Sequence, residues 1–260
     1  MGLLDGKVAM VSGIGPGMGR DISLTLAREG ADIAMLARRE EKMAEVAAEV
    51  EGLGRRAITI QGDITNAKDC DRAAATAKEK LGRIDILVNN AFHGGDYKSL
   101  MDADLNDWKV TIETNFIGTM QLTKAVVPAM KELGEGRIVM INTQSSLWVK
   151  PNFGAYAGSK AALAFATKTL ARELGGFGIR VNGIHPGFIW GDSVRGYLER
   201  QAVARGVPFQ QVYDEVAAET CLGYLPDSAE ISGSVLFLAS DLARPVTGQW
   251  FAVNCGQYLP

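Results

Sequence analysis

Short runs of apolar residues alternate with longer stretches in which apolar positions recur at helical spacing. In the first third of the chain, strand-like and helix-like segments follow in the order Val8–Val11, Gly19–Arg28, Asp32–Leu36, Glu40–Leu53, Ala57–Ile60 and Lys68–Leu81. A strand, a helix and a second strand are typical of βαβ units, whose strands run parallel. The beginning of the chain therefore predicts a parallel sheet.

The alternation continues beyond this point. Strands are expected at Ile84–Val88, Arg137–Ile141, Ile179–Asn182 and Trp250–Val253, and helices at about Asp104 to Leu133, Ala155 to Leu174 and Ala229 to Ala239. Right-handed crossovers place helices on both faces of such a sheet. We therefore predict an α/β fold, a Rossmann-like doubly wound parallel sheet of seven strands, in a single domain spanning residues 1–260.

Residues 188–224 interrupt this regular pattern with a segment rich in Gly, Gln and aromatic residues. The segment is too long for an ordinary connection, and segments of this length in compact domains commonly bind or cover ligands. In open α/β sheets, ligands bind outside the carboxyl ends of the strands. We expect residues 188–224 to be a substrate-binding loop or lid at that edge.

Composition excludes several classes of function. With 27 basic and 30 acidic side chains, the net charge of −3 gives no overall field that attracts nucleic acid or an anionic membrane. Cys70, Cys221 and Cys255 lie far apart, which predicts neither a disulfide framework nor a metal site. The chain lacks the pattern of a signal peptide and any apolar stretch of about 20 residues, so a cytoplasmic location is expected.

A glycine-rich turn joins the first strand to its helix. Residues 12–19 read Ser-Gly-Ile-Gly-Pro-Gly-Met-Gly, and Met18 stands where the ordinary G-x-G-x-x-G fingerprint has its last glycine. The spacing G-x-x-x-G-x-G fits instead, through Gly13, Gly17 and Gly19. Missing side chains let backbone N–H groups and a helix N-terminus approach a pyrophosphate. The alternative is a glycine-rich turn without a ligand.

The end of the second predicted strand bears on the choice between NAD and NADP. A carboxylate that would hold the ribose hydroxyls of NAD is missing there, and the sequence continues from Ala37 to Arg38 and Arg39. A guanidinium matches the oxygens of a ribose 2′-phosphate, so NADP(H) is preferred and NAD(H) stays possible. The alternative is that the arginines belong to a solvated helix end. Asp63, before Ile64, can accept a hydrogen bond from adenine or cap the next helix.

Candidate acid–base chemistry lies on the helix that begins near Ala155. Tyr156 and Lys160 are four residues apart and share one helical face. A nearby ammonium favours the phenolate and lowers the pKa of a tyrosine towards the useful range. Thr143 and Ser145 follow the preceding strand and offer hydroxyls to a substrate carbonyl. Asn115 stands inside a predicted helix, where asparagine is unfavourable, and this indicates a polar role.

These residues together resemble the short-chain dehydrogenase/reductase family from Lys7 to Gly256. The segments that match are the glycine turn, Asn89-Asn90-Ala91, Asn115, the Tyr156 and Lys160 pair, Pro186-Gly187 and Thr247-Gly248-Gln249. The resemblance implies that Tyr156 exchanges a proton with the substrate oxygen. It also implies that Lys160 binds the nicotinamide ribose and lowers the pKa of Tyr156, and that Asn115 holds a water in a proton relay.

The cofactor site expected on this basis consists of Ser12, Gly13, Gly17, Met18, Gly19, Arg38, Asp63, Ile64, Asn90, Ala91, Tyr156, Lys160, Pro186, Gly187 and Ile189. Four departures from the family stand out. Thr143 occupies the usual position of serine, so it is the first choice for the catalytic hydroxyl and Ser145 the second. Phe92 replaces a glycine, and Gly191 replaces a threonine that often binds the carboxamide. Asn254-Cys255-Gly256 replaces Asp-Gly-Gly without an evident chemical reason.

The expected substrate is a small-molecule secondary alcohol or ketone with a bulky apolar body, which is alicyclic, aromatic or steroid-like. The candidate pocket is formed by Phe92, Ser145, Trp148, Phe153, Phe188, Trp190 and Tyr197. His93 is a weaker candidate, and His185 is expected to be structural. One alternative is a β-ketoacyl thioester (acyl-carrier-protein) reductase. Gly134 and Phe177 count against it, because they occupy the positions where basic docking residues are expected. The other alternative is a non-catalytic cofactor-binding regulator.

The resemblance further implies a homodimer or homotetramer built on the two long helices. An apolar face formed by Ala161, Ala162, Phe165, Ala166 and Leu170 fits such an interface. Core packing explains the same pattern equally well.

Overall fold

The computed structural model describes residues 2–259 and contains the predicted sheet of seven parallel strands. The strands are β1 (Val8–Ser12), β2 (Asp32–Ala37), β3 (Ala57–Gln61), β4 (Ile86–Asn89), β5 (Gly136–Ile141), β6 (Ile179–Pro186) and β7 (Trp250–Val253). Their spatial order is β3-β2-β1-β4-β5-β6-β7. The direction of winding reverses between β1 and β4, which is the point where doubly wound sheets bind ligands.

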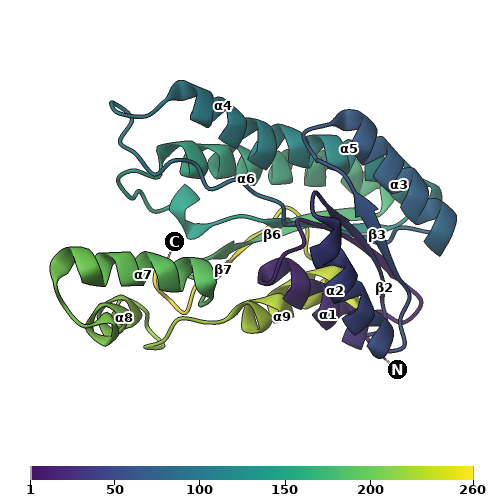
Figure 1. The fold of residues 1–260 in the computed structure, drawn as a ribbon. Coiled ribbons are helices and arrows are strands. Elements are labelled where there is room, and N and C mark those ends of the chain that lie inside the picture. The colour runs from purple at the N-terminus through teal and green to yellow at the C-terminus, as the bar shows by residue number, and fades with distance from the viewer. Residues whose placement is uncertain (1, 260) are drawn as a thin grey trace.

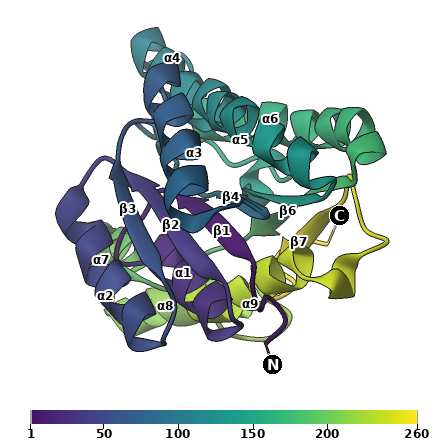
Figure 2. The ribbon, with the colours of Figure 1, turned by 90° about the vertical axis from the view of Figure 1, so that its right-hand side faces the viewer.

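Helices cover both faces of the sheet (Figure 1, Figure 2). One layer contains α1 (Met18–Arg28), α2 (Glu40–Gly52) and α9 (Ser228–Ala239). The other contains α3 (Ala67–Leu81), α4 (Leu105–Ile112), α5 (Thr119–Leu133) and α6 (Gly154–Leu174). The predicted three-layer α/β fold is therefore confirmed. Within residues 2–259, the helices contain no apolar stretch of the length needed to cross a bilayer.

Each strand of the sheet centre contributes to two apolar cores, one under each helical layer. In β1, Ala9 and Val11 face the core beneath α1 and α9, whereas Val8 and Met10 face the core beneath α3 and α5. Successive side chains of a strand point to opposite faces, so a strand buried on both sides is apolar throughout. This explains why the strands appear in the sequence as continuous apolar runs.

The helix expected from Asp104 to Leu133 is interrupted. A π-helical segment, Glu113–Gly118, separates α4 from α5 and contains Asn115. A Cβ atom at Gly118 would lie 3.1 Å from the backbone of Ile64, so the widened turn is packed closely against the neighbouring loop. Such segments occur frequently at functional sites. The predicted helical stretch from about Asp104 to Leu133 is therefore confirmed, and the π-helical turn within it was not predicted.

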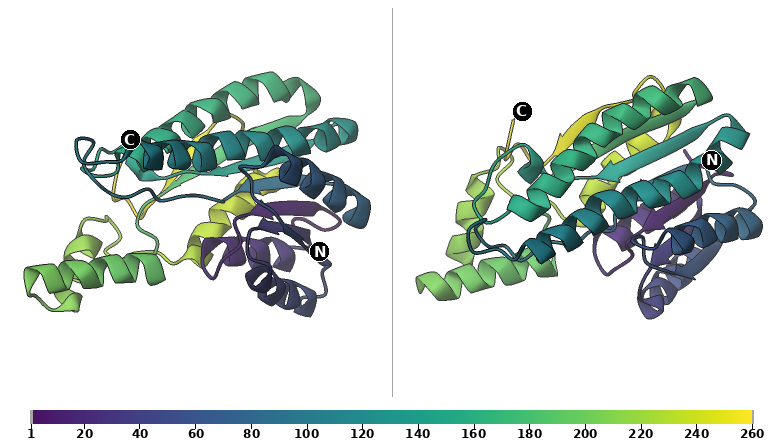
Figure 3. Two further views of the ribbon diagram at one scale, coloured as in Figure 1. Left: turned by 45° about the horizontal axis from the view of Figure 1, so that its top comes forward. Right: turned by 90° about the horizontal axis from the view of Figure 1, so that it is seen from above.

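The segment 188–224 is not irregular, because it contains α7 (Asp192–Arg205) and α8 (Phe209–Ala218). These helices project beyond the carboxyl edge of the sheet (Figure 3). They pack on each other around a small core of Leu198, Ala202, Val212 and Leu225. Each helix fully buries two residues, and the apolar residues of α8 at helical spacing, Phe209, Val212, Tyr213 and Val216, pack in this small core.

Candidate active site

The glycine turn after β1 has the backbone geometry that a pyrophosphate needs. Gly13 has φ = 78°, and a Cβ there would lie 2.5 Å from Ala91 Cα. A Cβ at Gly19 would lie 2.3 Å from the carbonyl oxygen of Gly13, so neither position accepts a side chain. A Cβ at Gly17 would point into open space. Gly17 is also the N-cap residue of α1, and it makes no side-chain capping hydrogen bond. The first N–H groups of α1 are therefore available to a phosphate, and the residues present fit a dinucleotide.

The side chains behind this turn hold strands together. The Ser12 hydroxyl accepts hydrogen bonds from the backbone N–H groups of Asn90 (3.2 Å) and Ala91 (3.3 Å). Asn90 donates from Nδ2 to the carbonyl oxygen of Gly13 at 2.8 Å. Ser12, expected in the cofactor site, is thus buried with its hydroxyl committed to the β1–β4 connection. It shapes the turn instead of offering its side chain to a ligand.

Arg38 and Asp63 lie at the carboxyl ends of β2 and β3. Arg38 is exposed, and among residues 2–259 its guanidinium has no hydrogen bond or ion pair, while its carbonyl accepts a hydrogen bond from Gln61 Nε2 at 3.1 Å. Asp63 Oδ1 accepts from the backbone N–H and the hydroxyl of Thr65, both at 2.9 Å. The cap of α3 is Asn66, not Asp63. Ile64 is buried between Gly118 and the core.

Tyr156 lies in the first turn of α6 and meets the end of β5. Burial and the nearby Tyr97 raise the pKa of Tyr156, and a hydrogen bond with the Thr143 hydroxyl partly offsets the rise. Thr143 Oγ1 also accepts from the backbone N–H of Ser145 at 3.2 Å. The Thr143 hydroxyl is therefore close enough to the phenol to influence its pKa. Because burial dominates, the phenol is protonated at neutral pH.

Lys160 is almost completely enclosed beneath this site, with 2% of its surface exposed. Its Nζ donates to the carbonyl oxygen of Ile141 at 2.7 Å. Asn142 Nδ2 donates to the Lys160 carbonyl at 3.0 Å and fixes the helix against β5. Burial lowers the pKa of Lys160 to about 7. Within residues 2–259, the Lys160 ammonium is held in place without a carboxylate partner.

Asn115 connects the π-helical segment to the Tyr156 helix. Its Nδ2 donates to the carbonyl of His93 and to Ser159 Oγ, both at 2.9 Å, and its Oδ1 accepts from the backbone N–H of His93. Ser159 Oγ in turn donates to the backbone carbonyl of Tyr156 at 2.7 Å. Ser159 was not predicted from the sequence, although it lies between Tyr156 and Lys160 on the buried side of α6. This chain of hydrogen bonds fixes the backbone that carries Tyr156.

Aromatic rings form the wall around Tyr156. The ring of Phe92 lies edge-on to Tyr156, with centroids 6.2 Å apart, and Phe153 lies edge-on to Tyr97 at 4.9 Å. Tyr97, which no sequence motif indicated, adopts a positive φ of 53°. These four rings bring the predicted Phe92 and Phe153 together with the reaction centre.

The remaining predicted pocket residues form two further groups. Trp148 and Phe188 lie on either side of Lys150, and Phe188 stacks on Tyr197 with centroids 6.0 Å apart. Trp190 packs edge-on against Tyr213 at 5.0 Å inside the small core of α7 and α8. The structure therefore packs Trp190 among the residues of α7 and α8 and does not bring it to Tyr156.

The departure at Asn254 has a structural explanation. Asn254 Nδ2 donates to Gln144 Oε1 (3.0 Å) and to the carbonyl of Tyr258 (2.9 Å), while Oδ1 accepts from the backbone N–H of Gly256. An ionised aspartate could not donate these bonds. A Cβ at Gly187, after β6, would collide with Asn254 Cβ at 2.9 Å. Asn254 thus holds the C-terminal residues against the Gly187 turn.

The two histidines have structural contacts. His185 in β6 is buried, and its Nδ1 lies 2.8 Å from the carbonyl oxygen of Thr143 and 3.2 Å from Ser146 Oγ. Burial lowers the pKa of His185, so the ring is neutral. His93 lies in the loop after β4, with Nδ1 3.1 Å from Thr111 Oγ1. Gly191, an extended residue before α7, has no side chain to offer a carboxamide.

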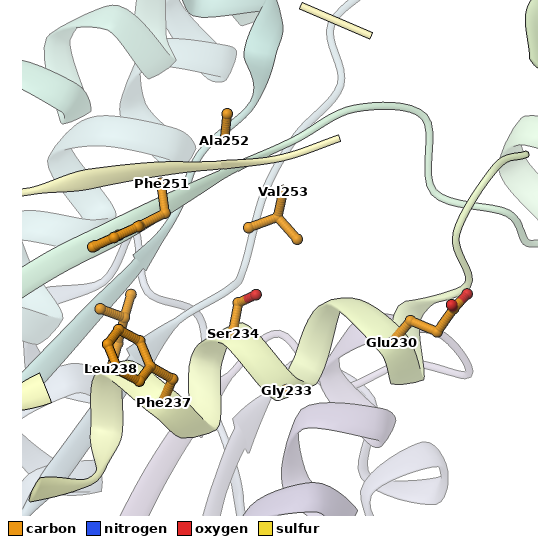
Figure 4. Close-up of a pocket in the computed structure, with 8 residues that line it drawn as sticks. All are labelled: Glu230, Gly233, Ser234, Phe237, Leu238, Phe251, Ala252 and Val253. Atoms are coloured by element: carbon orange, nitrogen blue, oxygen red, sulfur yellow. The ribbon is translucent and has the colours of Figure 1, made fainter. Parts of the chain in front are cut away.

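A shallow hollow also lies between α9 and β7 (Figure 4). Phe237 of α9 and Phe251 of β7 meet there edge-on, with centroids 6.1 Å apart. Its lining contains none of the predicted site residues. The candidate active site is therefore the edge of the sheet around Tyr156.

Comparison with known proteins agrees with this geometry. A family model described as enoyl-(acyl carrier protein) reductase matches residues 13–257. Oxidoreductase UcpA of Salmonella typhimurium is 36% identical over 265 residues, covering 100% of this chain and 97% of that protein. The 7alpha-hydroxysteroid dehydrogenase of Escherichia coli is 32% identical, covering 97% and 94%. A 3-oxoacyl-[acyl-carrier-protein] reductase of Synechocystis is 32% identical, covering 100% of both chains.

Solved structures show the same fold. Carveol dehydrogenase from Mycobacterium avium in complex with NAD superposes with a TM-score of 0.93 at 32% identity, covering 99% of each chain. L-Sorbose reductase from Gluconobacter frateurii, complexed with NADPH and L-sorbose, gives 0.92 at 28% identity and covers 99% of this chain and 98% of that one. The chain belongs to the short-chain dehydrogenase/reductase family of oxidoreductases. The resemblance found in its motifs is therefore confirmed.

Proposed function

We propose that this enzyme interconverts a secondary alcohol and a ketone by reversible hydride transfer, with Tyr156 as the general acid and base. The observation that carries the proposal is the meeting of Tyr156, Thr143 and Lys160 at one sheet edge, beside a glycine turn with room for a dinucleotide. The nicotinamide supplies or accepts the hydride when it is bound. The relatives bound to NAD and to NADPH support a cofactor of this class.

Side chains of this protein donate and accept the proton that the reaction requires. In ketone reduction, protonated Tyr156 donates to the developing alkoxide, and the Thr143 hydroxyl holds the same oxygen by a second hydrogen bond. In alcohol oxidation, Tyr156 must accept the proton. The enclosed Lys160 ammonium then favours the phenolate because its charge is not neutralised by a carboxylate. The hydrogen bonds of Asn115 and Ser159 keep the Tyr156 backbone in place during both directions.

The substrate proposed is a bulky apolar alcohol or ketone. The rings of Phe92, Tyr97 and Phe153 around Tyr156 offer an apolar surface next to a single polar centre. Two relatives, named as a carveol dehydrogenase and a hydroxysteroid dehydrogenase, are named for bulky ring alcohols. We further propose NADP(H) as the preferred cofactor, because Arg38 offers an unpaired guanidinium at the end of β2.

The test is Tyr156→Phe, assayed through the absorbance of the reduced nicotinamide with ring ketones, hydroxysteroids and a ketoacyl thioester. We expect kcat to fall about 10³-fold, while fluorescence titration shows cofactor binding within about twofold of wild type. Tyr224→Phe is the matched control, since Tyr224 bonds to Glu230 away from the site. Unchanged turnover in Tyr156→Phe would exclude the mechanism. A wild-type protein that binds cofactor but converts no substrate would be a regulator, and preference for the thioester would make it an acyl reductase.

We also propose that α6 pairs with a second copy of the chain, as a homodimer or as half of a homotetramer. Phe165 on this helix is 73% exposed, and Ala161, one turn away, is exposed as well. An apolar face of this kind loses water-exposed area in a two-fold interface. Light scattering should give at least twice the chain mass, and Phe165→Glu should lower it.

A further inference from the structure

The ammonium group of Lys150 is held between two aromatic rings of the candidate substrate cleft. Its Nζ lies 4.4 Å from the centroid of the Trp148 ring and 4.5 Å from that of Phe188. Lys150 and Trp148 follow the short turn that begins after Thr143, and Phe188 follows β6, the neighbour of β5 in the sheet. The cation therefore lies at the same edge of the sheet as the proposed catalytic hydroxyl.

The two rings are themselves fixed by further stacking. Trp148 stacks on Tyr258 near the C-terminus, with centroids 6.5 Å apart and planes 6° from parallel. Phe188 stacks on Tyr197 of α7. The lysine side chain would otherwise sample many rotamers, and the two rings confine it. The protein thus positions this ammonium, whereas most surface lysines are free to move.

The charge of Lys150 is not neutralised by a direct partner. Within residues 2–259 its ammonium makes no ion pair or hydrogen bond, so its three donors are unused. Burial lowers the pKa of Lys150, and the carboxylate of Glu219 partly offsets this. Glu219 Oε2 is already hydrogen-bonded to Gln257 Nε2 at 2.9 Å. A half-buried cation with unused donors can form charge-assisted hydrogen bonds with an anion.

We propose that Lys150 binds an anionic group of the substrate, a carboxylate in the first instance, remote from the reacting carbon. The proposal rests on the proposed function, because it specifies the substrate class of the same site. The apolar body of the substrate then lies along Trp148 and Phe188, its carbonyl reaches Tyr156, and its carboxylate accepts hydrogen bonds from Lys150 Nζ. The preferred substrates are ketones and alcohols that carry a carboxylate at the far end of an apolar ring.

The kinetic test compares a cyclohexanone bearing a carboxylate opposite the carbonyl with its uncharged methyl ester. A charge-assisted hydrogen bond should favour the acid by about ten- to hundredfold in kcat/KM. In Lys150→Met, which keeps the length of the side chain, the ratio should fall to about one, with kcat/KM for the ester within about threefold of wild type. Lys150→Arg should retain the preference. Lys168→Met, on the exposed side of α6, is the matched control for loss of one positive charge.

A binding measurement separates this inference from the proposed function. Calorimetry of the cofactor-loaded enzyme with cyclohexanecarboxylate and with cyclohexanecarboxamide should show about tenfold tighter binding of the carboxylate in wild type and no difference in Lys150→Met. If this difference is found but neither ketone is reduced, the anion site stands and the proposed function fails. If ketones are reduced but neither the kinetic ratio nor the binding difference depends on Lys150, the anion site is wrong and the proposed function stands.

Discussion

The two edges of the sheet differ in whether their charged side chains have oppositely charged partners inside the protein. At the amino edge, the fully buried Asp85 accepts hydrogen bonds from the backbone N–H of Val8 (2.9 Å) and from Arg83 Nε (2.7 Å), and lies 3.3 Å from Lys7 Nζ. At the carboxyl edge, Lys160 is equally buried, but among residues 2–259 its ammonium has only the carbonyl oxygen of Ile141 as a partner. Arg38 and Lys150 have no carboxylate within ion-pair distance anywhere in residues 2–259.

This difference between the edges distinguishes charged residues that matter for stability from charged residues that matter for function. A charge with all its partners inside the protein has nothing left to offer a ligand, and removing one of those partners is destabilising. A positioned charge without a partner lowers stability and is retained where a ligand or a transition state uses it. Substitutions at the amino edge should therefore change the free energy of unfolding, and those at the carboxyl edge should change turnover or binding.

The largest expected effect is on turnover in Lys160→Met. Loss of the ammonium removes the charge that favours the Tyr156 phenolate, so kcat for alcohol oxidation should fall about 10³-fold, or about 4 kcal/mol. The free energy of unfolding should not fall, because the buried cation that lowers it is lost together with one hydrogen bond to Ile141. Steady-state kinetics and urea unfolding measure the two quantities. A large loss of stability with normal kcat would show that Lys160 is structural.

Asp85→Asn should give the reverse result. The substitution keeps the shape of the side chain but leaves Arg83 and Lys7 without their buried counter-charge, which should cost about 3 kcal/mol of unfolding free energy. This figure is at the lower end of the usual range because both cations are partly exposed to water. kcat per folded molecule should not change. Asp241→Asn is the control: its side chain is 77% exposed and its pair with Arg137 should contribute at most about 1 kcal/mol.

Arg38→Leu should affect the cofactor alone. If Arg38 binds the 2′-phosphate, KM for NADP⁺ should rise about 30-fold, or about 2 kcal/mol, and KM for NAD⁺ should stay within about twofold. Arg39→Leu is the control for the loss of charge next to the same strand. A wild-type enzyme that prefers NAD⁺, or equal effects of the two substitutions on both cofactors, would mean that Arg38 is a solvated helix residue.

The regular part of the fold and the centre of the site were predictable from local patterns. Strands buried on both faces appear as apolar runs, and helical spacing alone places Tyr156 and Lys160 on one face. The helices α7 and α8 were missed because they pack on each other in a small core of their own, outside the alternation of strands and helices that forms the sheet. The π-helical segment around Asn115 was missed because helical periodicity does not distinguish one wide turn from the regular helix around it.

Other site residues depend on contacts between distant segments. Ser159 matters because Asn115, which is far from it in sequence, donates to its hydroxyl. Lys150 gains its role from Phe188, and the role of Asn254 depends on Gln144. Without a partner in view, each of these residues is an ordinary polar side chain. The aromatic candidates were predicted from the sequence, but which of them lie near Tyr156 was not. Only the packing places Trp190 among the residues of α7 and α8.

The last expected effect concerns the pH dependence of the unfolding free energy. Burial lowers the pKa of Lys160 from its usual 10.5 to about 7, so between these pH values the unfolded chain binds a proton that the folded chain does not. The folding penalty of this group is therefore fully present below about pH 7 and disappears as the pH rises towards 10.5. Unfolding free energy should increase with pH in this window by up to about 1.4 kcal/mol per unit more in wild type than in Lys160→Met. If the unfolding free energies of the two proteins change with pH in parallel, the folded protein solvates the Lys160 ammonium. The two edges of the sheet then do not differ in how well they accommodate a buried charge at this residue.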